Sequence, residues 1–198
     1  MPLAREKVLD LLKKNKGFLP SKLAREAGIS FSALKRLERN ELIKRATRGL
    51  YIGSDVWPDE FYIAQFRYPN AIFSHETALY LHGLCDRYPM RLMMTALSGD
   101  RSNIFKDPKI RVFRSGANLF NERAETIETE LGNSVTVYSM ERTLCECLFY
   151  RDILDLDHVI SALKWYILNP DRDFDKLLKC AELFNMRREV HFLMAAML

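Results

Sequence analysis

Small and apolar residues between positions 24 and 37 follow a spacing that strongly limits how this chain can fold. The residues that carry the spacing are Ala24, Gly28, Ile29, Leu34 and Leu37. A small residue four positions before a glycine lets two helices pack closely, and glycine adopts the left-handed conformation that a tight turn between them requires. The apolar positions after the turn recur at helical spacing. The segment therefore predicts a helix-turn-helix.

The segments on either side extend this motif. Before it, apolar residues recur at helical spacing, and Gly17 ends the predicted first helix. After it, apolar and polar residues alternate around a turn that contains Gly49, which predicts a β-hairpin. Three helices followed by a hairpin is the order of a winged helix. We therefore expect residues 1–55 to form a winged helix-turn-helix domain that binds DNA.

The net charge of +4 is distributed unevenly along the chain. Residues 1–53 contain 13 Lys and Arg against five Asp and Glu, a net charge of +8. The remaining 145 residues contain 17 basic and 21 acidic residues, a net charge of −4. A basic unit joined to a mildly acidic body favours a polyanionic partner for the first unit, such as nucleic acid. A solvated surface without a partner is the alternative.

The exposed face of the second helix of the helix-turn-helix, together with the hairpin, predicts how the protein binds DNA. The residues concerned are Phe31, Ser32, Lys35, Arg36, Arg39, Lys44, Arg45 and Arg48. We expect Ser32, Lys35 and Arg36 to read base edges in the major groove of double-stranded DNA. The other basic residues contact phosphates in this interpretation, and Arg48 reaches the minor groove from the hairpin tip. Phe31 either touches a thymine methyl group or packs into the turn, and a motif used only for protein contacts is the alternative.

Residues 59–198, after a linker at 53–58, predict a second domain that contains both helices and strands. The expected helices are at 59–68, 74–84, 140–151, 157–168, 174–184 and 187–198, and the expected strands at 91–97, 109–115, 124–132 and 134–139. We expect Ser21, Ser30, Ser74 and Ser139 to cap helices. The predicted fold class is α+β: an N-terminal winged helix-turn-helix followed by a mixed α/β domain with a helical C-terminal third.

Motifs of enzymes and of metal sites are missing from the sequence. His75 and Glu76 begin a pattern like that of zinc proteases, but position 79, where the second histidine must stand, is Leu. Cys145 and Cys147 have no second ligand pair at a suitable spacing, so we expect buried free thiols there. Gly-rich phosphate loops and nucleophile elbows do not occur. We therefore expect a binding protein that is not an enzyme and that holds no metal or cofactor.

The sequence also bears on where the protein works. No run of residues is long and apolar enough to cross a bilayer. The first residues lack the apolar centre of a signal peptide. We therefore expect a cytoplasmic protein that has no membrane partner.

A second basic stretch lies in the larger domain. Residues 87–114 contain seven Lys and Arg against two Asp. In the strand expected at 109–115, Lys109 and Arg111 share one face with Phe113, and Arg114 falls on the other. Lys109, Arg111 and Arg114 are therefore candidates for a second polyanion surface or for a surface that binds a partner. A solvated sheet face is the alternative.

Four short segments of the larger domain carry a resemblance to a known family. They are Ser74–Leu79 (SHETAL), Leu81–Leu84 (LHGL), Tyr138-Ser139 and Glu141–Thr143 (ERT). Together with a winged helix at the N-terminus, they resemble the AbiEi family of abortive-infection antitoxins over essentially the whole chain. Within these segments, Arg142 is expected to pair with an internal carboxylate.

The resemblance implies a function that composition cannot show. AbiEi proteins are the antitoxins of type IV toxin–antitoxin systems, which take part in bacterial defence against phage. The larger domain is then expected to counteract a nucleotidyltransferase-like toxin without forming a stable complex with it. The winged helix is expected to repress the protein's own operon by binding operator DNA at inverted repeats.

Two other interpretations stay open. The first is a ligand-responsive winged-helix transcriptional regulator without antitoxin activity, which a deep pocket with convergent polar groups would favour. The second is a nuclease or another DNA-modifying enzyme, which buried carboxylates around a metal would favour.

Overall fold

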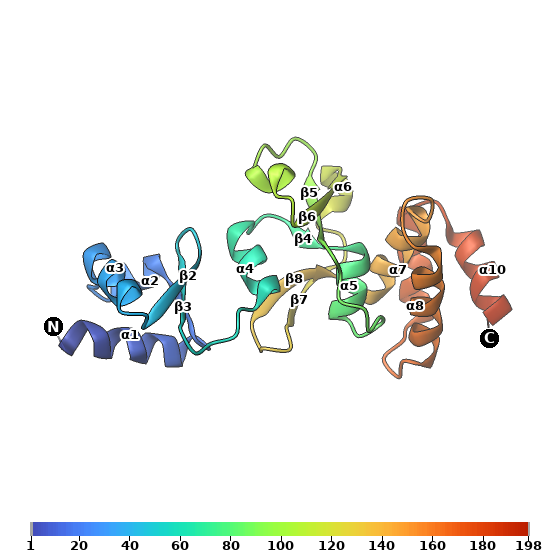
Figure 1. Cartoon of the computed structure of the whole chain (residues 1–198). Coiled ribbons are helices and arrows are strands. Elements are labelled where there is room, and N and C mark those ends of the chain that lie inside the picture. Colours follow the sequence, from blue (N-terminus) through green and yellow to red (C-terminus); the bar gives the residue numbers. More distant parts are fainter. Residues whose placement is uncertain (1, 198) are drawn as a thin grey trace. The chain divides into compact units, whose positions relative to one another are not determined.

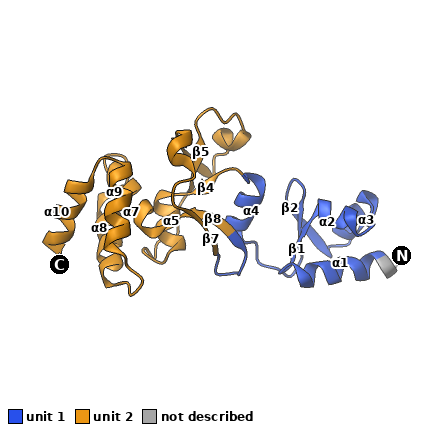
Figure 2. Ribbon diagram, turned by 180° about the vertical axis from the view of Figure 1, so that it is seen from behind, with its two compact units in different colours: residues 1–69, 128–134 blue, residues 70–127, 135–198 orange. Residues whose placement is uncertain are grey.

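The computed structural model describes residues 2–197. It is a mixed α+β chain, as predicted, and it divides into two compact units (Figure 2). The first unit holds residues 1–69 and 128–134, and the second holds residues 70–127 and 135–198. Because packing alone does not show which segment folds by itself, the division into domains 1–55 and 59–198 stays a prediction.

Helices and a three-stranded sheet make up most of the first unit (Figure 1). In chain order they are α1 (Pro2–Lys14), β1 (Phe18–Pro20), α2 (Ser21–Glu26), α3 (Phe31–Arg39), β2 (Ile43–Thr47), β3 (Leu50–Gly53) and α4 (Glu60–Arg67). Strand β3 lies between β1 and β2 and is antiparallel to both. The short strand β1 was not predicted. The arrangement is compatible with a winged helix-turn-helix.

The residues of the predicted helix-turn-helix spacing belong to the core of the first unit. Ala24, Ile29, Leu34 and Leu37 are all buried in one apolar cluster. Gly28, in the turn between α2 and α3, has a φ of +76°, a conformation that glycine adopts without steric strain. The prediction of two helices joined by a glycine turn is confirmed.

The other face of this sheet is covered by α4. Phe18, Leu50 and Ile52 are buried in a second apolar cluster. Tyr62 and Phe66 of α4 pack against that cluster, and the Phe18 and Tyr62 ring centroids lie 4.8 Å apart in an edge-to-face arrangement. Residues beyond position 55 therefore bury one face of the sheet.

A loop from the second half of the chain completes the first unit. Residues 128–134 belong to this unit, and they lie against the turn that follows α1. The Lys16 ammonium donates a hydrogen bond to the carbonyl oxygen of Gly132 and lies 3.5 Å from Glu128 Oε1. Lys16, near the end of a basic helix, is thus held by contacts within the unit.

A five-stranded mixed sheet forms the first part of the second unit. Its strands are β4 (Ile72–Phe73), β5 (Leu92–Leu97), β6 (Ile110–Ser115), β7 (Ala124–Glu128) and β8 (Ser134–Tyr138), in the spatial order β6-β5-β4-β8-β7. Strand β5 is antiparallel to β4 and parallel to β6, while β4 is parallel to β8. Its shorter helices are α5 (His75–Leu81), η1 (Asn103–Lys106) and α6 (Ala117–Phe120). The four predicted strands are present, and β4, with two residues, was missed.

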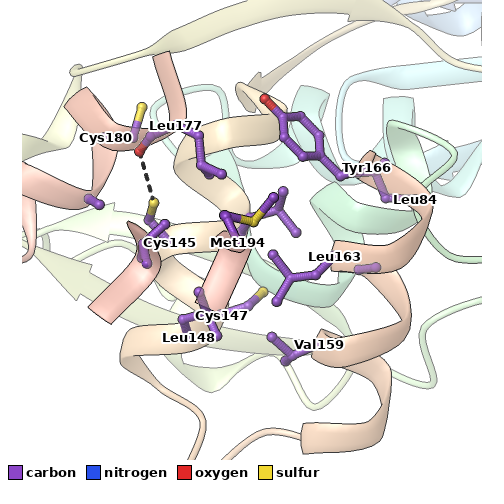
Figure 3. Packing of buried hydrophobic residues seen from close by; sticks show 14 of the residues in the cluster. Leu84, Cys145, Cys147, Leu148, Val159, Leu163, Tyr166, Leu177, Cys180 and Met194 are labelled. Carbon is purple, nitrogen blue, oxygen red and sulfur yellow. Dashed lines mark hydrogen bonds between the residues drawn. The ribbon is translucent and has the colours of Figure 1, made fainter. Parts of the chain in front are cut away.

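The C-terminal third is helical, as predicted. Its helices are α7 (Met140–Phe149), α8 (Leu156–Leu168), α9 (Phe174–Leu183) and α10 (Arg187–Met197). Helix α7 packs against α5, α8 and α9, and all its residues from Glu141 to Leu148 are buried. Figure 3 shows part of this core, where Cys145 Sγ lies 3.6 Å from the Leu177 carbonyl oxygen. No helix in residues 2–197 is long and apolar enough to cross a membrane.

The four serines expected to cap helices fall into two pairs. Ser30 accepts a hydrogen bond from the Ala33 amide and Ser139 from the Arg142 amide, so both caps are confirmed. The other two predictions are wrong. Helix α2 already includes Ser21, and Pro20 stands at its cap position. Ser74 precedes α5 but makes no capping hydrogen bond, because its hydroxyl accepts from Thr95 and contacts His75 Nδ1.

Candidate nucleic-acid interface

Helix α3 presents the polar face that the sequence predicts. Leu34 and Leu37 are buried on its inner side, and the Ser30 cap satisfies the Ala33 amide at its first turn, 3.2 Å away. The predicted outward residues are all exposed: Phe31, Ser32, Lys35, Arg36 and Arg39. The apolar spacing therefore fixes which side chains of the helix face solvent.

Phe31 lies at the exposed start of α3. Its side chain is 61% exposed, so the interpretation in which it packs into the turn is wrong. The Lys35 ammonium lies 5.0 Å from the centre of the Phe31 ring, one helical turn away. An apolar ring and a cation therefore stand together on this face of the helix.

Two basic residues that the sequence analysis missed lie beside this face. Lys22 and Arg25 of α2 are exposed, and they line a hollow that Ser30 and Phe31 also line. Their spacing of three residues places them on one side of α2. That spacing, in the helix before the turn, is the signal that could have identified them.

The hairpin β2–β3 separates its two neighbouring basic residues. Lys44 pairs with Ile52 in the sheet register and Arg45 pairs with Tyr51, so their side chains lie on opposite faces. The Lys44 ammonium donates to the Ser54 carbonyl oxygen at 3.0 Å, and Arg45 Nε donates to the Thr47 carbonyl oxygen at 3.4 Å. Tyr51 belongs to the same cluster as Leu34 and Leu37. Arg45 therefore lies on the face of the sheet that packs against α1, α2 and α3, and Lys44 lies on the face that packs against α4.

The tip of the hairpin carries an exposed cation. Arg48 and Gly49 form the turn between β2 and β3, and Gly49 has a φ of +84°. A register shift between Arg45 and Thr47 bends the strand just before the turn. Arg48 is exposed there, as the sequence analysis predicted.

Acidic residues lie beside the base of the hairpin. Burial raises the pKa of Tyr51, the nearby Glu38 carboxylate raises it further, and the Arg45 guanidinium opposes both. Glu38 and Glu41 also line a hollow together with Lys44 and Arg45. The first turns of α3 and the hairpin tip are therefore better suited to a polyanion than the hairpin base is.

In the second unit, the structure does not bring Lys109, Arg111 and Arg114 onto one open face. Lys109 is exposed just before β6. Arg111 is half-buried and donates to the Ile153 carbonyl oxygen at 3.1 Å, and Phe113, on the same side of the strand, is buried. Arg114 is exposed, with its guanidinium 4.0 Å from the Phe105 ring centre. The surface formed by these residues stays a prediction, and its exposed members are Lys109 and Arg114.

His75, which begins the pattern like that of zinc proteases, and His82, at the C-terminal end of the same helix, both make other contacts. His82 Nε2 donates to the Tyr138 carbonyl oxygen at 2.7 Å. His75 is buried, and its ring stacks on Phe113 with centroids 3.6 Å apart. Within residues 2–197, no three His, Cys, Asp or Glu side chains gather in a way that could hold a metal ion.

These features bear first on the structural class of the protein. Three helices, an antiparallel hairpin and an exposed basic helix after a glycine turn are compatible with the winged helix-turn-helix class of DNA-binding proteins. Residues 6–52 match the model of a family described as transcriptional regulator, AbiEi antitoxin. The resemblance to AbiEi antitoxins is thus confirmed over these residues, which hold the helix-turn-helix and most of the hairpin. The match does not extend to the segments at 74–84 and 138–143 that carried the resemblance in the sequence.

A solved structure shares the fold over most of the chain. The crystal structure of the RV2827C protein from Mycobacterium tuberculosis superposes with a TM-score of 0.61 at 14% sequence identity. The likeness covers 92% of this chain and 72% of that chain. At this identity it concerns the fold alone. Among curated proteins, no sequence matches this chain.

Proposed function

We propose that this protein is an antitoxin that also represses its own operon by binding operator DNA. The observation that carries the proposal is the exposed basic face of α3, within a segment that matches the AbiEi regulator family. A capped helix with a buried apolar side and a cationic outer side has the shape and charge that the major groove accepts.

The residues have distinct roles in this proposal. Ser32, Lys35 and Arg36 meet base edges, since Lys and Arg donate to guanine O6 and N7. Phe31 contacts a thymine methyl group, because its ring is exposed at the start of the same helix. Phosphate contacts fall to the surrounding cations: Lys22, Arg25, Arg39, Arg45 and Arg48. Operator sites that are inverted repeats would require two copies of the chain, one at each half-site.

The antitoxin activity belongs to the second unit in this proposal. It counteracts a nucleotidyltransferase-like toxin of a type IV system, without a stable complex, and contributes to phage defence in the cytoplasm. No catalytic role is assigned to the chain. The support for this part is the family match of residues 6–52.

Co-expression and operator binding test the two activities separately. The gene adjacent to this protein's own gene is expressed as the toxin, with the full chain or with the Lys35→Ala/Arg36→Ala variant. We expect both chains to restore growth, while only the wild type binds DNA from upstream of its own gene. Absence of rescue by the wild-type chain, against a neighbour that is toxic, would exclude the antitoxin function.

The ligand-responsive regulator stays the second candidate, because the second unit contains a pocket lined by buried polar groups. In that case a small molecule changes operator affinity, and the wild-type chain does not rescue growth. Measuring operator affinity with and without ligand, beside the rescue assay, separates the two functions.

A further inference from the structure

A pocket in the second unit collects unsatisfied polar groups. Among the described residues, three buried side-chain atoms have no hydrogen-bond partner: His75 Nε2, Arg142 Nε and Glu146 Oε2. All three residues line one pocket of about 210 Å³, and each is at most 3% exposed. Buried polar atoms are nearly always paired in native proteins, because leaving them unpaired is unfavourable. Their convergence in one pocket therefore points to a ligand that pairs with them.

The polar groups are held rigidly by their other contacts. Arg142 donates to the carbonyl oxygens of Leu119 and Glu122 and to Glu146 Oε1, the last at 3.1 Å. Its guanidinium carbon lies 3.4 Å from the centre of the Tyr138 ring. Arg142 Nε and Glu146 Oε2 remain without a partner, so the pair offers a donor and an acceptor in fixed positions.

His75 adds a third polar group and an unusual backbone. Its φ is +52°, in the left-handed region that residues other than glycine seldom adopt. Such conformations concentrate at binding and catalytic sites. Burial lowers the pKa of His75 to about 3, with the Arg111 and Arg142 charges adding to the effect. The ring is therefore neutral at pH 7 and Nε2 can pair with an uncharged group.

Aromatic side chains form the apolar wall of the pocket. Phe113, Phe149, Tyr150 and Phe184 line it, and neighbouring rings contact one another, with the Phe149 and Phe184 centroids 5.5 Å apart. Aromatic rings of this kind stack with planar ligands, and every nucleobase has such a face. Each nucleobase also carries a hydrogen-bond donor beside an acceptor on its Watson–Crick edge.

The open side of the pocket carries positive charge. Arg114 lines the pocket and is exposed. The two guanidinium groups of Arg114 and Arg142 outnumber the single carboxylate of Glu146, so the pocket favours an anionic ligand. Its volume is below that of typical sites for drug-sized molecules, so it can hold one ring system with a charged group outside.

We propose that this pocket binds a mononucleotide, with the base against the aromatic wall and the phosphate on Arg114. The base edge pairs with Arg142 Nε, Glu146 Oε2 and His75 Nε2. This site is separate from the DNA-binding face of α3, and it does not depend on the antitoxin function proposed above.

Calorimetric titration of the full chain tests the proposal. The probes are AMP, GMP, CMP and UMP, each beside its nucleoside, which lacks the phosphate. We expect at least one mononucleotide to bind saturably, at one per chain, and more tightly than its nucleoside. Arg114→Ala should remove that difference, while Phe149→Ala should weaken both ligands about tenfold. Both side chains are exposed, so the variants should keep the wild-type circular dichroism spectrum.

Two control variants test whether the mononucleotide binds in the pocket and not elsewhere on the protein. Lys164→Ala removes an exposed cation of the same unit that does not line the pocket, and it should bind as the wild type does. Lys35→Ala/Arg36→Ala should also leave mononucleotide affinity unchanged, which excludes binding at the DNA interface. The proposal is overturned if no mononucleotide binds at millimolar concentration, or if neither Arg114→Ala nor Phe149→Ala weakens the binding.

Discussion

Asn133 Nδ2 donates a hydrogen bond to Asp59 Oδ2 at 2.8 Å, across 74 residues of sequence. The same carboxylate oxygen accepts from Thr129 Oγ1 at 2.6 Å, and Asp59 Oδ1 accepts from the Tyr62 amide at 3.0 Å. Asp59 is only 2% exposed. One buried carboxylate thus caps α4 and also holds the 128–134 loop in the first unit.

Asp59→Ala should destabilise the first unit. Three donors lose their acceptor in a buried site, and the expected loss is roughly 3 kcal/mol of the free energy of unfolding. Asp59→Asn keeps one oxygen and should recover part of that loss. Urea denaturation followed by circular dichroism measures the change, and Asp55→Ala, at an exposed aspartate nearby, is the matched control. Equal stability of Asp59→Ala and Asp55→Ala would contradict the role given to Asp59.

The contacts of α4 predict where the N-terminal segment can be shortened. A fragment of residues 1–69 keeps Tyr62 and Phe66 on the cluster formed by Phe18, Leu50 and Ile52, whereas a fragment of residues 1–55 exposes that cluster. The shorter fragment should therefore unfold at a lower temperature and bind an apolar dye more strongly. Equal melting temperatures for the two fragments would show that residues 1–55 are sufficient as a domain.

Replacing two side chains of α3 should abolish operator recognition. In Lys35→Ala/Arg36→Ala the donors to base edges are lost, at about 1–3 kcal/mol for each good bidentate contact, and specific affinity should fall to the level of unrelated DNA. Fluorescence anisotropy with operator and scrambled duplexes measures this difference. Lys164→Ala/Lys179→Ala, which removes two exposed charges from the second unit, controls for net charge. Retained discrimination in the double variant would refute the assignment of α3 as the recognition helix.

Substitutions at the two ends of the hairpin should differ in their effect on the salt dependence of DNA binding. Arg48 stands exposed at the tip, whereas the Lys44 ammonium donates to Ser54 and lies on the face opposite Arg45. Each phosphate contact contributes about 0.9 to the slope of log affinity against log salt concentration. Arg48→Ala should lower that slope by about this amount, and Lys44→Ala should lower it by much less. Similar slopes for both variants would show that the hairpin tip does not approach the phosphates.

Local patterns predicted the helix-turn-helix well, because its spacing sets both the turn at Gly28 and the buried side of α3. The sequence also predicted that Arg142 pairs with an internal carboxylate, because a charged residue in an apolar helix requires a partner. The structure shows that this carboxylate is Glu146. Features set by contacts distant in sequence were missed. The hydrogen bond from Asn133 to Asp59 is one, and it leaves no periodic signal in the sequence.

The pocket and the failed cap at Ser74 have the same physical origin. Sequence reasoning treats a serine before a helix as a cap, yet here the hydroxyl contacts Thr95 and His75. Thr95 stands on β5, a strand whose partners are set by the whole sheet. The nearest sequence signal was the presence of charged residues such as Glu146 within the apolar stretch that forms α7, because a charged residue on a buried helix marks a polar site in the core.

The buried His75 should make the stability of the second unit depend on pH. Burial lowers the pKa of His75 from the ordinary value of 6.5 to about 3. Between these two pH values, the ring stays neutral in the folded protein but takes up a proton in the unfolded chain. The contribution of His75 to the free energy of unfolding is fully present above about pH 6.5 and is lost as the pH falls from there toward 3.

His75→Asn removes the titrating group, and asparagine tolerates a positive φ. In urea denaturation between pH 6 and pH 4, the stability of the variant should fall less steeply than that of the wild type, by up to about 1.4 kcal/mol per pH unit. His191→Asn, at an exposed position of α10, is the matched control, and equal slopes for wild type and His75→Asn would show that the His75 ring is accessible to protons in the folded protein.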